Sequence, residues 1–535
     1  MRLYFKFLLF TTSIILFINC AKTGRPDGGP KDEKAPLFVI SEPPYKSINF
    51  NKKEIKLYFN EFIKLKDLNK QLIVSPPLKN PLLITPQGTA SKFLKIEIID
   101  TLKLNTTYIF NFGNAVEDNN ESNVLEGFKY IFSTGTYIDS LTSTGIISDA
   151  FKNTKPKRID LALYKIDSTY TDSIIYKEKP NYVTTAIDTT GFRFTNLRKG
   201  KYLLIAIEDA SSDYIFDPKV DKIGFYTDTL QLPRDSIIAE NIRLFKEIQP
   251  YKFKRGKEIT KGKIEFGYEG KIKDLKVNLL SKVPDSFKSV AKLDLEKDTL
   301  NYWHTPIDAD SLNFTISNAN FIDSVTVFLR KKKIDSLQLS ASTNSVLHFR
   351  DTFFIKSNNP IIHVDTTKII FTDKDTINVD YRKMISKKEN KIGLLFKKKE
   401  KERYKLQLLP GAIRDLFAVK NDTLNYNFST KEFEDYGRIT LQVVNNKNYN
   451  VIVDLLADKD KIIERNYIKS TETLIFKQLE PNKYTFRAII DKNNNRIWDT
   501  GNFLKKQMPE KVIYFSEILN VRANNFLEGN TFTIE

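Results

Sequence analysis

Apolar and polar residues alternate in short runs along most of this chain. The run from Ile55 to Asn60 alternates in this way, as does the run from Tyr108 to Gly113. Asn, Asp, Gly and Pro separate the runs, and few segments show a helical stripe. Because a period of two buries one face of a strand, the pattern predicts an all-β protein. Short strands at intervals of ~8 to 12 residues favour β-sandwiches or barrels.

Two pairs of segments repeat within the chain. Residues 192–217 align without a gap on residues 474–499, so that Tyr202 matches Tyr484 and Asp209 matches Asp491. A weaker repeat starts at Thr107 and again at Arg403, and Phe-Ser-Thr follows both copies. Repeated segments indicate that the same module occurs twice. A length of 535 residues also exceeds what one hydrophobic core can organise.

The amino terminus has the layout of a secretion signal. Arg2 and Lys6 precede an apolar run, residues 7–18, that is shorter than the ~20 residues of a membrane span. Asn19-Cys20 and a polar stretch rich in Gly and Pro follow. This pattern resembles a bacterial lipoprotein signal, in which the thiol of the cysteine, here Cys20, receives a diacylglyceryl group and becomes the mature amino terminus. The alternative is an uncleaved anchor with an incidental cysteine.

Charge and cysteine content narrow the class of protein. Cys20 is the only cysteine, so no disulfide can form within the chain. The formal charge is +18, and removal of Arg2 and Lys6 leaves +16, spread among acidic residues. Two explanations of this charge are open. The basic residues lie in solvated loops, or they attract the chain to an anionic membrane surface. Secretion argues against a nucleic-acid partner, and no motif for one is visible.

The amino-terminal quarter carries a family resemblance. The tether CAKTGRPDGGPKDEKAP, the strand IKLYFNEFIKLKD and the segment NTTYIFNFGNAVEDNNESN together resemble the Ig-like-domain outer-membrane lipoproteins of Bacteroidetes, whose first module is a bacterial Ig-like domain of the SbsA type. The match covers residues 20 to about 136. Lys31-Asp32-Glu33 resembles the signal that sends such lipoproteins to the cell surface; attachment facing the periplasm is the alternative. The repeated module around Gly200-Lys201-Tyr202 resembles the transthyretin-like or carboxypeptidase-regulatory sandwich.

The chain is therefore predicted to contain tandem Ig-like and transthyretin-like β-sandwich modules. The predicted order is a lipoprotein signal peptide (1–19), a tether (20–35), an Ig-like domain (36–136), a transthyretin-like sandwich (137–248), a β-rich domain of unknown type (249–350), a second Ig-like domain (351–433) and a second transthyretin-like sandwich (434–535).

A repeated acidic turn is the strongest chemical signal in the sequence. Its oxygen-bearing residues have the spacing of a Ca²⁺ loop, although neither copy has the central glycine or the final glutamate of an EF-hand. The alternative is a plain turn, because Asp and Asn bond to their own backbone. The candidate ligands are Asp209, Ser211, Asp213 and Asp217 in the first copy, and Asp491, Asn493, Asn495 and Asp499 in the second.

Two aromatic residues, Phe216 and Trp498, lie at matching positions within these turns. If exposed, they could stack on a sugar or enter a partner protein; otherwise they close the ends of their own sandwiches.

No pattern of catalytic residues is visible. His304, His348 and His363 are scattered without metal-ligand spacing, and no nucleophile elbow or phosphate loop occurs. We expect a non-catalytic lipoprotein, attached to the outer membrane by its acyl chains and exposed on the cell surface, that acts as a structural scaffold for other envelope proteins. The expected partners are an outer-membrane barrel, other lipoproteins, or an assembly or secretion complex. A glycan-binding accessory lipoprotein is the alternative.

Overall fold

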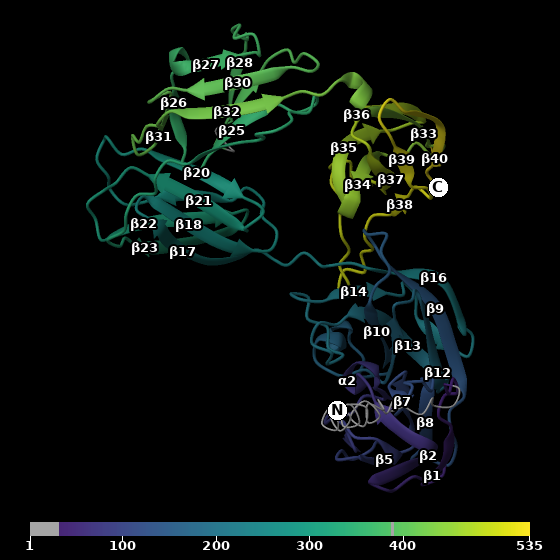
Figure 1. The fold of residues 1–535 in the computed structure, drawn as a ribbon. Helices are drawn as coiled ribbons and strands as arrows, with labels where there is room; N and C mark the ends of the chain where they lie inside the picture. Colours follow the sequence, from purple (N-terminus) through teal and green to yellow (C-terminus); the bar gives the residue numbers. More distant parts are fainter. Residues whose placement is uncertain (1–30, 387–389) are drawn as a thin grey trace, which may run out of the picture.

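The computed structural model describes residues 31–386 and 390–535 of the chain. The predicted signal peptide and Cys20 lie outside the described residues. The described strands fall into five successive β-sandwiches, which we number modules 1 to 5 in chain order (Figure 1). The all-β prediction is confirmed. Within the described ranges, no helix is long and apolar enough to cross a bilayer.

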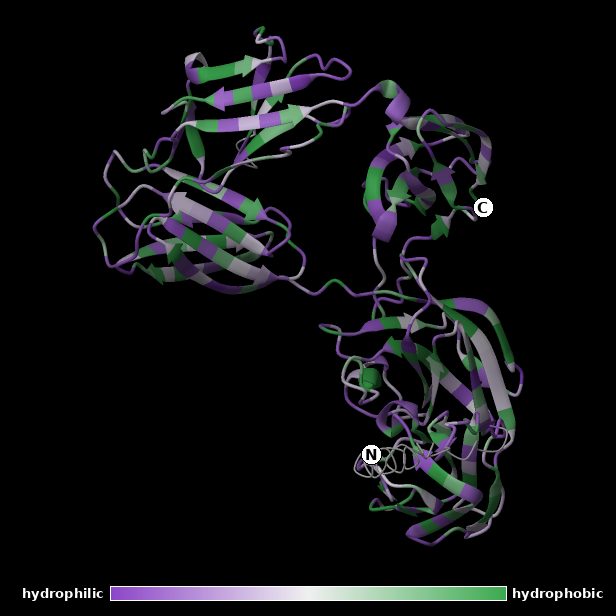
Figure 2. Ribbon diagram, viewed as in Figure 1, coloured by the Kyte–Doolittle hydropathy of each residue, from purple (hydrophilic) through white to green (hydrophobic). Residues whose placement is uncertain are grey.

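Alternation along the strands explains the sandwiches. In β2 (Glu54–Leu65), Ile55, Leu57 and Phe59 are buried in the module 1 core, while the residues between them face outward. Bands of apolar and polar residues follow one another along the strands of every module (Figure 2). Each sheet therefore buries the face that it turns toward its own sandwich. In module 2 the sheet that contains residues 158–165 and 200–208 buries its other face as well.

Modules 1 and 4 share one strand topology. In module 1 the first sheet has the order β1-β2-β5-β4, with β7 paired to β2, and the second has the order β3-β6-β8. In module 4 the sheets β24-β25-β29-β28 and β27-β30-β32 repeat these orders, and β26 pairs with β31 as β2 pairs with β7.

The elements of module 1 are β1 (Phe38–Glu42), β2, α2 (Leu68–Gln71), β3 (Ile73–Ser75), β4 (Leu83–Thr85), β5 (Ser91–Glu97), β6 (Thr107–Gly113), β7 (Val116–Asp118) and β8 (Phe128–Ser133). Those of module 4 are β24 (Leu339–Ala341), β25 (Phe353–Ser357), β26 (Ile361–Val364), η2 (Thr366–Lys368), β27 (Ile369–Thr372), β28 (Arg382–Ser386), β29 (Lys391–Leu395), β30 (Arg403–Leu408), β31 (Ile413–Asp415) and β32 (Leu424–Ser429).

Atomic details repeat between these two modules as well. The Lys103 backbone N–H donates to the Tyr108 hydroxyl, as that of Lys399 donates to Tyr404. The hydroxyl of Thr134 donates to the Lys103 carbonyl. Its counterpart in module 4 donates to the Lys399 carbonyl. The weak sequence repeat therefore corresponds to one strand order and one set of corner contacts.

Modules 2 and 5 form the second pair. Module 2 contains the sheets β11-β10-β13-β14, with β15 on β13, and β12-β9-β16. Module 5 contains β35-β34-β37-β38, with β39 on β37, and β36-β33-β40. In both, the last strand runs parallel to the first. The gapless sequence repeat falls on β12 and β13 in one module and on β36 and β37 in the other.

The elements of module 2 are β9 (Leu141–Asp149), β10 (Arg158–Lys165), η1 (Asp172–Tyr176), β11 (Tyr182–Ile187), β12 (Gly191–Leu197), β13 (Gly200–Glu208), β14 (Lys222–Phe225), β15 (Leu230–Leu232) and β16 (Ile237–Leu244). Those of module 5, with η3 (Phe433–Asp435) preceding it, are β33 (Gly437–Val444), β34 (Val451–Ala457), η4 (Asp458–Asp460), β35 (Lys461–Ile468), β36 (Glu472–Leu479), β37 (Asn482–Ile490), β38 (Val512–Tyr514), β39 (Leu519–Val521) and β40 (Phe526–Thr533).

Module 3, whose type the sequence left open, is also a sandwich. Its sheets have the orders β17-β18-β21-β20 and β19-β22-β23. The strands are β17 (Lys252–Thr260), β18 (Lys263–Glu269), β19 (Lys276–Leu279), β20 (Ser289–Asp294), β21 (Thr299–His304), β22 (Ser311–Asn318) and β23 (Phe321–Phe328).

The boundary predicted between residues 350 and 351 is wrong. β24 lies before that boundary but pairs with β25, so module 4 begins ahead of Leu339. The prediction missed β24 because a strand of three residues is too short to show alternation.

Candidate functional site: the junction between modules 2 and 5

Module 5 returns to contact module 2, although two modules separate them in the chain (Figure 1). The contact comes from an extension of the acidic turn after β37. Asp221 and Glu510 are equivalent, since each accepts hydrogen bonds from two backbone N–H groups at matching places in its turn. Three residues separate Asp217 from Asp221, whereas ten separate Asp499 from Glu510. We name these ten, residues 500–509, the docking segment.

The docking segment inserts an aromatic side chain into module 2. Phe503 is fully buried, and its ring centroid lies 5.4 Å from that of Phe225 in an edge-to-face contact. Gly501 passes close to Phe245, where an added Cβ would lie 2.6 Å from the ring carbon Cζ. A side chain at position 501 would therefore push the segment away from module 2.

Polar contacts fix the same segment. The Thr500 hydroxyl donates to the Lys246 carbonyl at 2.8 Å, and the Phe503 backbone N–H donates to Glu247 Oε1 at 2.6 Å. Lys506 Nζ forms an ion pair with Asp172 at 2.8 Å. Glu247 is only 7% exposed, and its burial raises the pKa of the carboxyl group. The backbone N–H of Phe503 partly offsets that effect, because it stabilises the charged form.

Phe151 of module 2 forms the other half of the junction. Its ring centroid lies 4.7 Å from that of Trp498 and 4.1 Å from the Arg487 guanidinium carbon. The Tyr514 hydroxyl donates to the Phe151 carbonyl at 2.7 Å. Aromatic, cationic and hydrogen-bonding groups of module 5 therefore surround one side chain of module 2.

Modules 2 and 5, the two copies of the repeated module, differ on the sheet face that meets the junction. In module 5, Asp454 is fully buried between Arg487 at 2.7 Å and Arg465 at 2.6 Å. In module 2 the equivalent register pair is Ala162 and Ile205, which belong to the cluster that receives Phe503. One copy therefore accepts an apolar side chain where the other carries an ion pair. Sequence reasoning missed these residues, because nothing local marks a charge as buried.

A polar cavity of about 860 Å³ lies along this junction. Both modules line it, and side-chain amides and charged groups of both signs predominate. The lining residues include Asp149, Asn241 and Arg243 from module 2 and Lys447, Asn450 and Lys511 from module 5.

The first acidic turn is closed by its own backbone. Asp209 accepts hydrogen bonds from the N–H groups of Ser211, Ser212 and Tyr214. Asp213 and Asp217 each accept one from the residue two positions later. Burial raises the pKa of Asp209. These are the contacts expected of an Asx turn.

The second acidic turn brings more of its predicted residues together. The side-chain amides of Asn493 and Asn495 each donate to Asp499 Oδ2 at 2.6 Å, and Asp491 accepts from the Asn495 and Arg496 backbone. Among the residues that the structure describes, no group of three or more His, Cys, Asp or Glu side chains is placed to hold a metal ion. Calcium at these turns stays a prediction.

Phe216 is not available to a ligand, so its assignment as a binding residue is wrong. It is 1% exposed and packs against Tyr176 inside module 2. The other aromatic residue, Trp498, is half-buried against Phe151, and its indole N–H donates to the Glu510 carbonyl. The matching positions therefore serve packing, within one module in the first copy and between two modules in the second.

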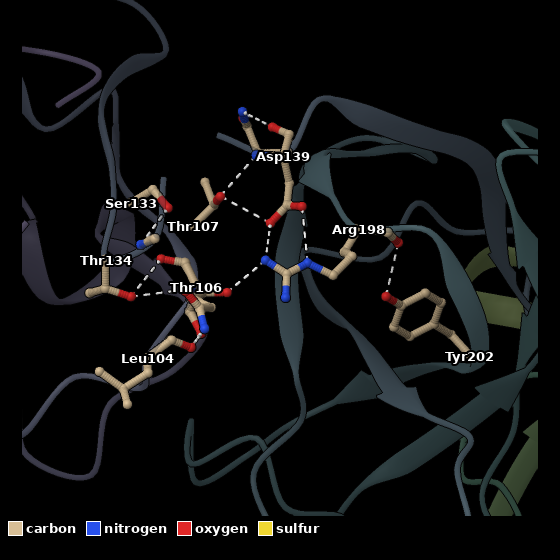
Figure 3. A network of polar contacts seen from close by, with 11 residues as sticks. Leu104, Thr106, Thr107, Ser133, Thr134, Asp139, Arg198 and Tyr202 are labelled. Atoms are coloured by element: carbon tan, nitrogen blue, oxygen red, sulfur yellow. Dashed lines mark hydrogen bonds and ion pairs between the residues drawn. The ribbon is translucent and has the colours of Figure 1, made fainter. Parts of the chain in front are cut away.

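The junction between modules 1 and 2 is also built from buried polar contacts (Figure 3). Asp139 is 5% exposed and forms an ion pair with Arg198 at 3.1 Å. Thr107 of module 1 donates to the same carboxylate, and Arg198 donates to the Asn105 carbonyl at 2.6 Å. A single arginine of module 2 thus links both modules and the segment between them.

Modules 4 and 5 meet through His348 and Phe349. The imidazole Nε2 of His348 donates to the Gln478 carbonyl at 2.9 Å, and its ring lies 4.8 Å from Tyr436. The ring of Phe349 packs against that of Phe433 in a tilted arrangement, with 4.6 Å between the ring centroids. Burial lowers the pKa of His348, which keeps the ring neutral near pH 7.

Comparisons with known proteins find a family similarity for one module. No curated protein matches the chain. Among solved structures, the S-layer protein SbsC is 11% identical, with 90% of this chain and 67% of that chain covered and a TM-score of 0.16. The TIE protein of Bacillus anthracis is 10% identical, with 95% of this chain and 76% of that chain covered and a TM-score of 0.14. The major pilin subunit of Bacillus cereus is 11% identical, with 74% of this chain and 99% of that chain covered and a TM-score of 0.14. Such low TM-scores carry no argument about module arrangement or function. The family of bacterial Ig-like domains matches residues 32–134, so module 1 is similar to that family.

Proposed function

We propose that this chain is a non-catalytic outer-membrane lipoprotein that acts as a rigid scaffold for other envelope proteins. Acyl chains on Cys20 hold it to the membrane, and the modules present loops and sheet edges to the partner. The observation that carries this proposal is the docking segment, which fixes module 5 on module 2. Interfaces between domains are often polar and permit motion. Here a fully buried phenylalanine and a buried carboxylate hold the junction, as a scaffold with a set geometry requires.

We propose that the partner binds the arrangement of modules that this junction fixes. Modules 3 and 4 connect two modules that are themselves in contact, so their positions depend on the docking segment. We call the arrangement in which module 5 is docked on module 2 the closed arrangement. We expect an outer-membrane barrel, or a component of an assembly or secretion complex, to bind the chain in this arrangement. We place the scaffold on the cell surface because of Lys31-Asp32-Glu33. The glycan-binding alternative has weaker support, because Phe216 and Trp498 are both engaged in packing.

Two measurements on the native protein test the proposal. Mass spectrometry of the amino-terminal peptide from detergent-solubilised outer membrane is expected to show diacylglyceryl-modified Cys20, and Cys20→Ser is expected to release the chain in soluble form. An unmodified thiol on a soluble product would contradict membrane attachment.

Affinity purification tests the scaffold role. Wild-type protein is expected to retain a barrel or lipoprotein partner, which Phe503→Ala loses. Leu504→Ala, which alters an exposed neighbour in the same segment, is the matched control and is expected to retain the partner. Equal recovery with both variants would show that the closed arrangement is not needed for binding.

A further inference from the structure

Apolar side chains gather on the outer face of the first sheet of module 1. The register places Ile40 opposite Tyr58 and Tyr58 opposite Phe93, so the three form a row across β1, β2 and β5. Ile40 is 60% exposed and Phe93 42%. Phe62 of β2 is 54% exposed, and Lys92 Nζ lies 5.4 Å from the centroid of its ring. We name Ile40, Tyr58, Phe62 and Phe93 the outer patch.

Neither the core of module 1 nor its neighbour explains the outer patch. The core lies on the opposite face of the same strands, where Leu57 and Phe59 are buried. Module 2 contacts the other sheet, where the Val183 backbone N–H donates to the Ser75 hydroxyl. β1, β2 and β5 lie at the end of module 1 farthest from module 2 (Figure 1). Ile40, Phe62 and Phe93 are exposed, and Tyr58 is half-buried beside them. Exposed apolar side chains gathered on one face of a sheet mark an interaction surface.

The first described residues lie beside this patch. The Asn123 side-chain amide donates to the Asp32 carbonyl at 2.8 Å, and the Leu37 N–H donates to the Asn60 side chain at 2.6 Å. The same loop reaches β2, since the Asn119 N–H donates to the Phe62 carbonyl. The chain therefore arrives at module 1 next to Phe62.

The distance to the anchor is short. Cys20 precedes Lys31 by eleven residues, and a chain of that length spans at most about 40 Å when fully extended. A lipid attached to Cys20 thus holds the outer patch within reach of the bilayer surface at all times. Such tethering raises the effective concentration of that surface at the patch.

We propose that the outer patch docks module 1 onto the headgroup region of the bilayer that holds the Cys20 acyl chains. This inference rests on the lipid anchor of the proposed function. Tyr and Phe side chains suit the boundary between headgroups and acyl chains, because each offers an apolar ring at the edge of a polar layer. Lys92 and Lys64, close to Phe62, can contact lipid phosphates. Docking would set the orientation of the remaining modules relative to the membrane.

The test uses the single cysteine of the mature chain. Protein beginning at Cys20 is coupled through its thiol to a maleimide lipid in vesicles of phosphatidylethanolamine and phosphatidylglycerol with brominated acyl chains. Bromine quenches tryptophan emission at short range. Phe93→Trp reports on the outer patch, and Phe328→Trp, at a 71% exposed position in module 3, is the matched control. The parent protein corrects for Trp303 and Trp498.

We expect Phe93→Trp to be quenched at least twofold more than Phe328→Trp and to shift to shorter wavelength. Adding Ile40→Ser and Phe62→Ser to the Phe93→Trp protein is expected to reduce quenching to the control level. Equal quenching of the two probes would overturn the inference, as would quenching that survives the two serine substitutions. A shift of the Phe93→Trp emission to shorter wavelength when an envelope protein is added without lipid would also overturn the inference and would assign the patch to a protein partner. Because the maleimide lipid supplies the anchor, these outcomes are independent of whether cells modify Cys20.

Discussion

Truncation of Phe503 to alanine tests whether the docking segment fixes module 5 on module 2. The side chain is fully buried and lies against Phe225 of module 2. Phe→Ala at a fully buried position costs about 3–5 kcal/mol, from lost transfer free energy and the cavity left behind. Every 1.4 kcal/mol is a factor of ten, so the ratio of docked to undocked module 5 should fall more than about a hundredfold.

Small-angle scattering and limited proteolysis measure this change. Phe503→Ala is expected to increase the radius of gyration and to expose residues 499–510 to cleavage, because the segment then lacks its buried anchor. Leu504→Ala, at a position 56% exposed, is expected to change stability by less than about 0.5 kcal/mol and to leave both readouts at the wild-type level. If Phe503→Ala gives the scattering curve and cleavage pattern of wild type, the docking segment does not hold the two modules together.

Four further outcomes are expected. Arg198→Ala should lower the free energy of unfolding of modules 1 and 2 by about 1–3 kcal/mol in urea titrations, because it leaves a buried carboxylate without its cation. Asp454→Asn should cost about 3–5 kcal/mol, since Arg487 is only 2% exposed and would lose its counter-charge. Glu247 has a folded-state pKa raised by burial, so its contribution to stability is largest at low pH and is lost as pH rises through that pKa; Glu247→Gln should flatten this dependence in thermal melts. If calcium binds the second acidic turn, EDTA should lower the unfolding temperature of wild type but not of Asp499→Asn.

Each of these outcomes has a control or a contrary result. Arg234→Ala removes an exposed arginine from an ion pair on the same module and should change stability by less than about 1 kcal/mol. A loss for Asp454→Asn no larger than that control would show that the buried pair is not needed. A pH profile unchanged by Glu247→Gln would assign the dependence to other groups. Equal EDTA responses in wild type and Asp499→Asn would remove the calcium prediction for that turn.

The repeats could be predicted because strand alternation and matched residue spacing are visible in short stretches of the sequence. Alternation located β2 and β6, and the matched spacing of Tyr202 and Tyr484 located the duplicated module. Both tyrosine hydroxyls donate to a carbonyl four residues earlier, which explains why this residue recurs in both copies. The strand pattern and these tyrosine contacts depend on residues close together in the sequence, so they can be predicted from it.

The junction was harder to predict, because it depends on contacts between distant segments. Phe503 and Phe225 show no local signal of their pairing, and the partnership of Asp454 with Arg487 appears only when β34 lies beside β37. One clue was present. The ten residues between Asp499 and Glu510 exceed the three at the matching place in the first copy, and the extra length carries the docking segment.

The parallel pairing of first and last strands in modules 2 and 5 has a mechanical consequence. Because β16 runs beside β9 in the same direction, the chain reaches module 2 at one pole and leaves it at the opposite pole. Tension between those poles would load the hydrogen bonds of this strand pair together, in shear, whereas an antiparallel hairpin pulled from its open end would yield one bond at a time. The same holds for β33 and β40. A chain built this way would resist being drawn out by a moving partner.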